Sequence, residues 1–178
     1  DVLVDEPDIS PLAIQGPKAD DLMANVFGDA IRDIKFFRYG MFDFQGRTLV
    51  IARSGYSKQG GFEIYVEGSD IGMDLWNALM EAGKPYDVWA GCPNLIERIE
   101  GGLLSFGNDM TMQNTPHECG LGKFCNTQTA IGCIGRDALL RVGKEGPVKQ
   151  IRALEIEGLP VGPCDQLWPV MAKGKQVG

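Results

Sequence analysis

The chain has 178 residues, of which 44% are hydrophobic, and this is enough apolar material for the core of one or two domains. Its 24 acidic residues exceed its 17 basic residues and give a formal charge of −7, so no excess of cations is present to neutralise a nucleic-acid backbone. No apolar run approaches the roughly 20 residues that cross a bilayer, and we therefore expect a cytoplasmic protein that binds neither nucleic acid nor membrane.

A strand followed by a helix is predicted between Pro11 and Gly28. A short apolar run leads to Gly16 and Pro17, and apolar residues then recur at helical spacing. Pro17 fits the first position of a helix, because its missing N–H would have no intrahelical partner there, and Gly28 can end the helix. Another short strand is predicted at residues 2–4.

The middle of the chain is predicted to be a strand meander followed by two helices. Residues 35–66, including Phe36 and Phe37, alternate aromatic and β-branched runs with glycine-rich turns. Ser69 can cap the first helix, which has apolar residues at helical spacing and ends near residue 83. A second helix is expected over residues 95–103.

Isolated elements are predicted in the last third of the chain. A short helix is expected at residues 135–141, a strand at 150–156, and a hairpin turn leading into a strand at 173–178. Because the first and last strands have no visible partners, we expect a chain that was cut at both ends from a longer protein.

Metal, hydrolytic and nucleotide chemistry find little support in the residue pattern. The five cysteines are odd in number, unpaired in spacing and without the Cys-x-x-Cys arrangement of structural zinc, so we expect reduced cysteines and no metal. The single histidine, His117, has neither a serine elbow nor a second histidine for a triad. No glycine-rich phosphate motif or Walker lysine is present.

A carboxylate in an otherwise apolar strand is the first candidate site residue. Glu63 lies between Phe62 and Ile64, after a glycine-rich turn, and the period-two rule places Glu63 and Tyr65 on the same face. A carboxylate beside an aromatic ring can hold a flat ligand that carries N–H donors. The alternative is that both side chains line a solvated sheet face.

Arg98, on the predicted helix 95–103, is the second candidate. On a helix it can clamp an anionic group with two hydrogen bonds, or it can pair with Glu97 or another neighbouring acid.

Taken in order, five segments of the chain resemble the folate-binding aminomethyltransferase family. The resemblance covers nearly the whole chain. The segments are Leu12-Ala-Ile-Gln-Gly-Pro-Lys18, Ser54-Gly-Tyr through Gly61-Phe-Glu-Ile-Tyr65, Arg98-Ile-Glu-Gly-Gly-Leu through Gly107-Asn-Asp109, Thr115-Pro-His-Glu-Cys-Gly-Leu-Gly122 and Ile134-Gly-Arg-Asp-Ala-Leu139.

The resemblance implies an α+β fold in which antiparallel sheets pack with helices around a central folate cavity. Residues 1–145 would form a folate-binding region that is incomplete at its N-terminus, and residues 146–178 the beginning of a C-terminal β-barrel. By the same resemblance tetrahydrofolate is the cofactor and Glu63 matches a pterin-binding glutamate. Tyr56 and Tyr65 match aromatic positions near the folate and the substrate, and Arg98 is assigned to folate binding. No catalytic residue is assigned.

Two segments resemble the demethylase branch of the family, which acts on dimethylsulfoniopropionate. They are Ser54-Gly-Tyr-Ser-Lys-Gln-Gly-Gly61 and Gly91-Cys-Pro-Asn-Leu-Ile-Glu-Arg-Ile-Glu100, in which Asn94 replaces an arginine of the aminomethyltransferases. The expected activity is methyl transfer from that small-molecule donor to tetrahydrofolate. The alternatives are glycine-cleavage aminomethyl transfer and non-catalytic folate binding. Exposed edges of the cut chain could pair in a homodimer.

Overall fold

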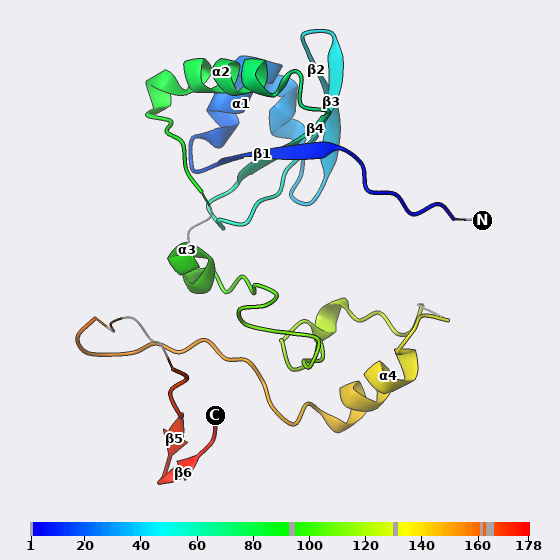
Figure 1. Ribbon diagram of the computed structural model, residues 1–178, viewed down its shortest axis with the longest axis vertical. Coiled ribbons are helices and arrows are strands. Elements are labelled where there is room, and N and C mark those ends of the chain that lie inside the picture. Colours follow the sequence, from blue (N-terminus) through cyan, green and yellow to red (C-terminus); the bar gives the residue numbers. More distant parts are fainter. Residues whose placement is uncertain (1, 93–94, 130–131, 161, 163–165) are drawn as a thin grey trace.

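One antiparallel sheet organises the first part of the chain. The computed structural model describes residues 2–92, 95–129, 132–160, 162 and 166–178. Four strands pair in the order β1–β4–β3–β2, which confirms the predicted α+β class with antiparallel sheets (Figure 1). Their bounds are β1 Ile9–Gln15, β2 Tyr39–Phe44, β3 Arg47–Ala52 and β4 Gly61–Glu67.

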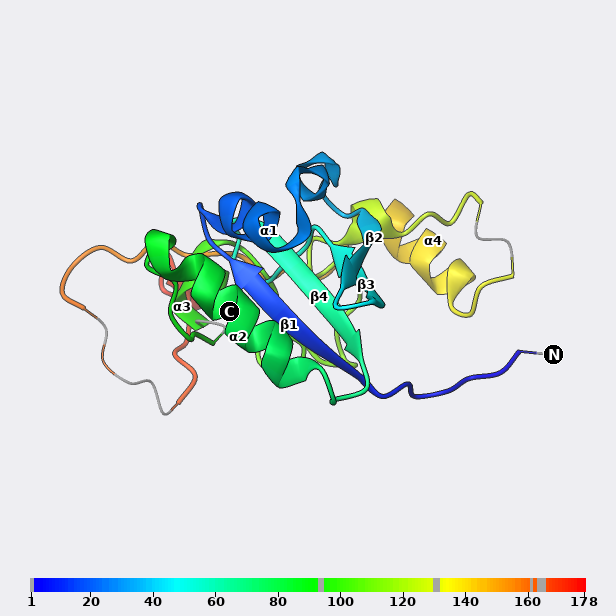
Figure 2. The same ribbon diagram turned by 90° about the horizontal axis from the view of Figure 1, so that it is seen from above.

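Two helices cover one side of this sheet. α1 (Ala19–Phe27) and α2 (Gly72–Gly83) lie side by side over the strands, and a 3₁₀ helix (Asp29–Asp33) follows α1 (Figures 1 and 2). Leu75 and Leu79, one helical turn apart, are buried against the sheet because apolar residues at that spacing share one helix face. The hydrophobic core is therefore a single layer between the two helices and the sheet.

The rest of the chain forms short elements, and those that come after the 3₁₀ helix following α2 lie away from α1 and α2 (Figure 1). Beyond Cys119 no side chain in the described part is buried. The elements are the 3₁₀ helix Lys84–Tyr86, α3 (Leu95–Glu100), the 3₁₀ helix Gly122–Phe124, α4 (Arg136–Glu145), β5 (Met171–Ala172) and β6 (Lys175–Gln176).

Several sequence predictions of secondary structure are confirmed. The strand–turn–helix beginning the chain corresponds to β1 and α1, with Gly28 at the helix end in a positive-φ conformation that glycine adopts without a Cβ clash. The helix at 135–141 is α4, and the turn at 173–174 joins β5 to β6. Among the described residues, no helix is long and apolar enough to cross a membrane.

Other predictions are wrong, each for a local reason. Phe36 and Phe37 lie in a turn rather than a strand, and Phe37 has φ 57°. Residues 2–4 and 150–156 are not strands: neither segment has a neighbouring strand with which to form a hydrogen-bonded ladder. Ser69 does not cap α2, whose N-cap position is Ile71 without a side-chain hydrogen bond.

Candidate functional site

The two faces of β4 have different surroundings. Phe62, Ile64 and Val66 point into the core and are at most 3% exposed. Glu63 and Tyr65 point to the opposite face and are half-buried. The period-two prediction for these side chains is therefore confirmed, and both lie on the sheet face away from α1 and α2.

Small residues flank Glu63 on both neighbouring strands. Ala13 of β1 and Ala52 of β3 are its direct partners in the ladder. Directly opposite residues in antiparallel strands bring their Cβ atoms within about 5 Å, so their size decides how much space surrounds the side chain between them. Two methyl groups crowd the Glu63 side chain little, and the residue is half-buried on the open face.

The row next to Glu63 is larger and apolar. Tyr65 lies between Pro11 of β1 and Val50 of β3, and Met41 of β2 continues the row beyond Val50. Met41 is 60% exposed, and Tyr39, which continues the Glu63 row, is 70% exposed. The open face thus combines an apolar, partly aromatic row with one carboxylate between two alanines. We call this arrangement of Ala13, Glu63 and Ala52 the carboxylate notch.

The Glu63 carboxylate is held by the loop that precedes β4. The hydroxyl of Ser54 donates a hydrogen bond to Glu63 Oε2. An ionised carboxylate has about four acceptor positions, so this bond leaves Oε1 and part of Oε2 for other donors. Ser54 therefore restricts the orientation of the carboxylate without consuming its capacity to accept hydrogen bonds.

Gln15, at the end of β1, anchors the same loop. Its Nε2 donates to the carbonyl oxygens of Ser54 (3.0 Å) and Phe62 (3.3 Å), and its Oε1 accepts from the Ser57 hydroxyl (2.7 Å). A Cβ at Gly61 would approach the Ile14 carbonyl oxygen to 2.1 Å. Because that residue is a glycine, the loop can lie this close to β1.

An ion pair anchors the start of the loop on the other side of the sheet. Arg53 Nη2 donates to both carboxylate oxygens of Asp20 in α1, at 2.9 and 2.8 Å. Its guanidinium also lies 5.0 Å from the ring centroid of Phe62, within the range of a cation–π interaction. The residue before Ser54 is thus tied to the helix layer.

Tyr56 connects the loop to the segment after α3. Its hydroxyl donates to the carbonyl of Leu104 at 2.6 Å, with the carbonyl of Leu103 at 3.5 Å. The side chain is 39% exposed. The hydroxyl is therefore committed to backbone, and the ring is the part of Tyr56 that remains available to a ligand.

Arg98 is buried in an ion pair. It is 4% exposed, and its Nη1 donates to Asp109 Oδ2 and, at 3.1 Å, to the carbonyl of Leu103. Of the two sequence alternatives, the structure therefore has pairing with an acid, but the acid is Asp109 and not Glu97. Its assignment to folate binding stays a prediction.

The helix that carries Arg98 buries its arginine and leaves its apolar side chains exposed. Leu95, Ile96 and Ile99 are each more than half exposed. Helix α3 has six residues and ends at Glu100, before the turn that receives the guanidinium.

Asp109 organises the turn between residues 103 and 109. Its Oδ2 accepts from the Ser105 amide at 2.7 Å as well as from Arg98. Burial alone would raise the pKa of this carboxyl, but the hydrogen bonds from the Ser105 amide and Arg98 outweigh it and lower the pKa below its ordinary value. Asp109 is therefore ionised wherever ordinary aspartates are.

Three of the five segments that carry the family resemblance meet at this site. Gln15 belongs to the first, Ser54 and Glu63 to the second, and Arg98 and Asp109 to the third. Sequence reasoning singled out Glu63 and Arg98 but missed the positioning roles of the other three. Their place inside the quoted motifs was the available signal.

The fourth and fifth segments do not join these hydrogen bonds in the described part of the chain. Thr115 and Glu118 exchange hydrogen bonds with each other. His117 lies against Gly143 of α4 and against Gly122, which begins a 3₁₀ helix. No group of three or more metal-ligating side chains was found among the described residues. Asn94 and Cys164 lie outside those residues.

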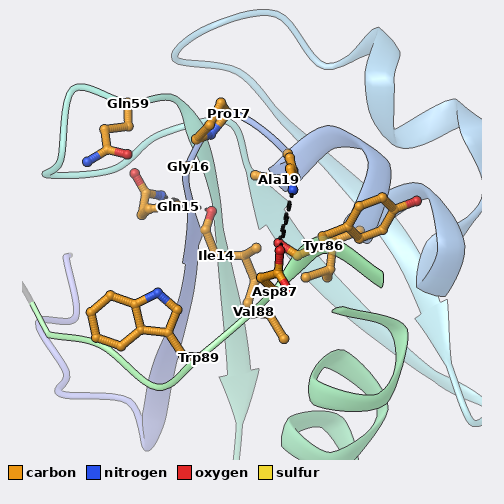
Figure 3. Close-up of a pocket in the computed structure, with 12 residues that line it drawn as sticks. Ile14, Gln15, Gly16, Pro17, Ala19, Gln59, Tyr86, Asp87, Val88 and Trp89 are labelled. Atoms are coloured by element: carbon orange, nitrogen blue, oxygen red, sulfur yellow. Dashed lines mark hydrogen bonds and ion pairs between the residues drawn. The ribbon is translucent and has the colours of Figure 1, made fainter. Parts of the chain in front are cut away.

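A cavity of about 260 Å³ adjoins the loop at the end of β1. Gln15 and Gln59 lie near each other at one side of it and Tyr86 at the other (Figure 3). Its charged side chains, Lys18 and Asp87, are exposed and 4.0 Å apart. Neither Glu63 nor Tyr65 lines it, so this cavity is separate from the carboxylate notch.

Comparison with known proteins shows the family to which the chain belongs. The GCVT N-terminal domain matches residues 2–129, and the chain belongs to that family. The expected aminomethyltransferase fold is thereby confirmed, whereas the residues predicted to begin a C-terminal barrel lie outside the matched range.

Curated relatives match the chain over nearly its whole length. It is 64% identical over 178 residues to the dimethylsulfoniopropionate demethylase DmdA of Ruegeria pomeroyi, covering all of this chain and 48% of the relative. It is 33% identical over 183 residues to an aminomethyltransferase of Clostridium botulinum (99% and 48% covered) and 31% identical over 167 residues to one of a Synechococcus strain (94% and 45%). The chain spans about half the length of the curated relatives it matches.

Proposed function

We propose that the open sheet face around Glu63 binds tetrahydrofolate, and that a chain of the relatives' full length transfers a methyl group to it from dimethylsulfoniopropionate. The observation that carries the proposal is the carboxylate notch: Glu63 stands between two alanines and its orientation is restricted by Ser54. The 64% identity to a protein named dimethylsulfoniopropionate demethylase supports the choice of donor.

The chemistry of the notch fits the edge of a pterin ring. Such a ring presents neighbouring N–H donors, and a carboxylate that keeps free acceptor positions can accept two of them at once. Glu63 would bind and orient the ring, with Oε1 wholly available. Tyr65 and the ring of Tyr56 would supply aromatic surface for the folate and for the sulfonium, a cation without N–H donors that an aromatic face can hold.

The proposed reaction breaks one C–S bond and forms one C–N bond. A methyl group passes from the positively charged sulfur to N5 of tetrahydrofolate, and the N5 proton is released. The sulfur loses its positive charge, so methylthiopropionate leaves as a thioether. The residues of this chain would act by alignment, since fixing two reactants in attack geometry can supply several kcal/mol, on the order of 7–11 in the best cases. No residue of the chain is assigned a proton-transfer role.

Titration with tetrahydrofolate tests the binding proposal. Anaerobic calorimetry would compare this 178-residue chain with a chain extended at both ends to the relatives' full length. Binding by the extended chain supports the site, and weaker binding by the shorter chain means that further segments complete it. Absence of binding by both chains would contradict the folate assignment.

Product analysis separates the candidate activities. Formation of 5-methyltetrahydrofolate from dimethylsulfoniopropionate by the extended chain would support demethylation. The identities of 31–33% to aminomethyltransferases make glycine cleavage the second candidate, which would instead give 5,10-methylenetetrahydrofolate and ammonia. Folate binding with neither product would favour a non-catalytic folate-binding protein.

The remaining predictions of the sequence concern the whole protein. We propose that the β5–β6 hairpin begins a C-terminal barrel, with the division after residue 145. Cytoplasmic location and a homodimer stay predictions. Size-exclusion chromatography with light scattering of the extended chain tests the homodimer.

A further inference from the structure

We propose that Arg98 and Asp109 are positioning residues that act on the Glu63 site through Tyr56 and the turn at residues 103–105, without contacting the folate. The proposal deepens the proposed function and rests on it for the binding effects described below. It replaces a direct folate contact for Arg98 with an indirect one.

The first step is the pair itself. Arg98 Nη1 and the Ser105 amide both donate to Asp109 Oδ2, and Nη1 also donates to the Leu103 carbonyl. The backbone amide of Leu103 donates back to the carbonyl of Arg98 at 2.8 Å. Both ends of the 103–105 turn are therefore fixed by the same ion pair.

The second step is the carbonyl between those two ends. Leu104 accepts the hydroxyl of Tyr56 at 2.6 Å, across 48 positions of sequence. Because the preceding and following residues are held by Arg98 and Asp109, the direction of this carbonyl is set by the pair. Tyr56 can form its short hydrogen bond only where the turn presents it.

The third step leads back to the carboxylate. Tyr56 lies two residues after Ser54, whose hydroxyl holds Glu63. Fixing the end of the Tyr56 side chain restricts the backbone from Ser54 to Tyr56, and so the position of the Ser54 hydroxyl. A second contact between the same segments, from Gln59 Nε2 to Glu97 Oε1 at 3.1 Å, makes the loop and α3 one unit.

Burial explains why Arg98 itself is not the ligand contact. The residue is 4% exposed, and its Nε is buried without a hydrogen-bond partner in the described part of the chain. The buried Nε cannot meet a ligand unless the turn opens, and Nη1 is committed to Asp109 and Leu103. Tyr56, by contrast, is 39% exposed.

Fluorine NMR tests the positioning step without any ligand. The chain has four tyrosines, so a 3-fluorotyrosine-labelled protein gives four resonances that single Tyr→Phe changes assign. We expect Arg98→Met to shift or broaden the Tyr56 resonance while those of Tyr39 and Tyr86 stay in place. Arg98→Lys, whose ammonium can reach the same acceptors, should bring the Tyr56 resonance part of the way back to its wild-type position. An unmoved Tyr56 resonance in Arg98→Met would overturn the proposal.

Arg47→Met is the matched control. Arg47 forms an ion pair with Asp70 through two hydrogen bonds of 2.7 and 2.8 Å, away from the loop. Its loss should leave the Tyr56 resonance unchanged. If Arg98→Met does not fold, Asp109→Asn, which removes the charge and keeps one acceptor, is expected to move the same resonance, and no movement there overturns the proposal as well.

A double-mutant cycle on tetrahydrofolate affinity tests the indirect route in the extended chain. Arg98→Met should weaken binding by roughly tenfold in the wild type but by less than about twofold in a Glu63→Gln background, because the effect passes through Glu63. Equal losses in both backgrounds mean that Arg98 contacts the folate itself and overturn the proposal. If the wild type binds no folate, the proposed function fails, and the fluorine spectra still decide the positioning role.

Discussion

Ser54 and Glu63 are joined by a side-chain hydrogen bond across the turn that begins β4, with the serine hydroxyl as donor and Glu63 Oε2 as acceptor. The two residues are nine positions apart, and the glycine-rich loop between them carries Tyr56 and Ser57. The carboxylate thus depends on the loop for its orientation. The first two predictions follow from this dependence.

Replacing Glu63 by glutamine removes the charge and one acceptor from the proposed ring-edge contact. In the extended chain we expect tetrahydrofolate affinity to fall by about 1.5–3 kcal/mol, the range for a hydrogen bond to a charged group. Calorimetric titration measures the change. The control is Glu67→Gln, on the same strand and face but exposed, which should leave affinity unchanged. Unchanged affinity in Glu63→Gln would remove Glu63 from the site.

Replacing Ser54 by alanine keeps the carboxylate but frees its rotamer. We expect folate affinity to fall by about 0.5–1.5 kcal/mol, less than for Glu63→Gln, because only orientation is lost. The same titration measures it, with Ser10→Ala on the exposed part of β1 as control. A loss larger than that of Glu63→Gln would mean that Ser54 contacts the ligand directly.

A Cβ at Gly61 meets backbone rather than a movable side chain. Gly61 has φ 144°, and the added atom would lie 2.1 Å from the Ile14 carbonyl oxygen. Strain and overlap each cost about 1–3 kcal/mol, so Gly61→Ala should lower the free energy of unfolding by roughly 2–6 kcal/mol. Urea unfolding followed by circular dichroism measures it.

Gly46→Ala separates the two costs in Gly61→Ala. Gly46 has φ 80° but no atom within 4 Å of its added Cβ, so only backbone strain of about 1–2 kcal/mol is expected. Equal losses for the two variants would contradict the close approach of the loop to β1.

The Asp109 carboxylate should protect the Ser105 amide in a pH-dependent way. Its pKa is lowered in the folded state by the Ser105 amide and Arg98, against the effect of burial, so its contribution is present above the ordinary aspartate pKa of about 3.9 and is lost as pH falls through the lowered value. At neutral pH, Asp109→Asn should therefore reduce the hydrogen-exchange protection of Ser105. The two proteins should converge only below the lowered pKa, and convergence already at pH 5 would contradict the assignment.

Much of the first layer could be predicted from local patterns. Alternating apolar residues placed β4 with its core-facing and open faces, and helical spacing placed α1 and α2, because residues at these periods share one face whatever their partners are. Glu63 and Tyr65 were correctly placed on one face of the strand for the same reason. Propensity failed where no ladder partner was present, as at residues 150–156, and where a turn overrode aromatic strand preference, as at Phe37.

The sequence by itself determined which side chains share a face of each strand or helix, and its motifs indicated the family. The tertiary structure alone decided that Arg98 pairs with Asp109, that Tyr56 bonds to Leu104, and that Gln15 holds Ser54 across 39 positions. Contacts between distant segments depend on the path of the chain between them, which no periodicity encodes. The orientation of Glu63 is therefore a product of the fold, although its strand and face are a property of the sequence.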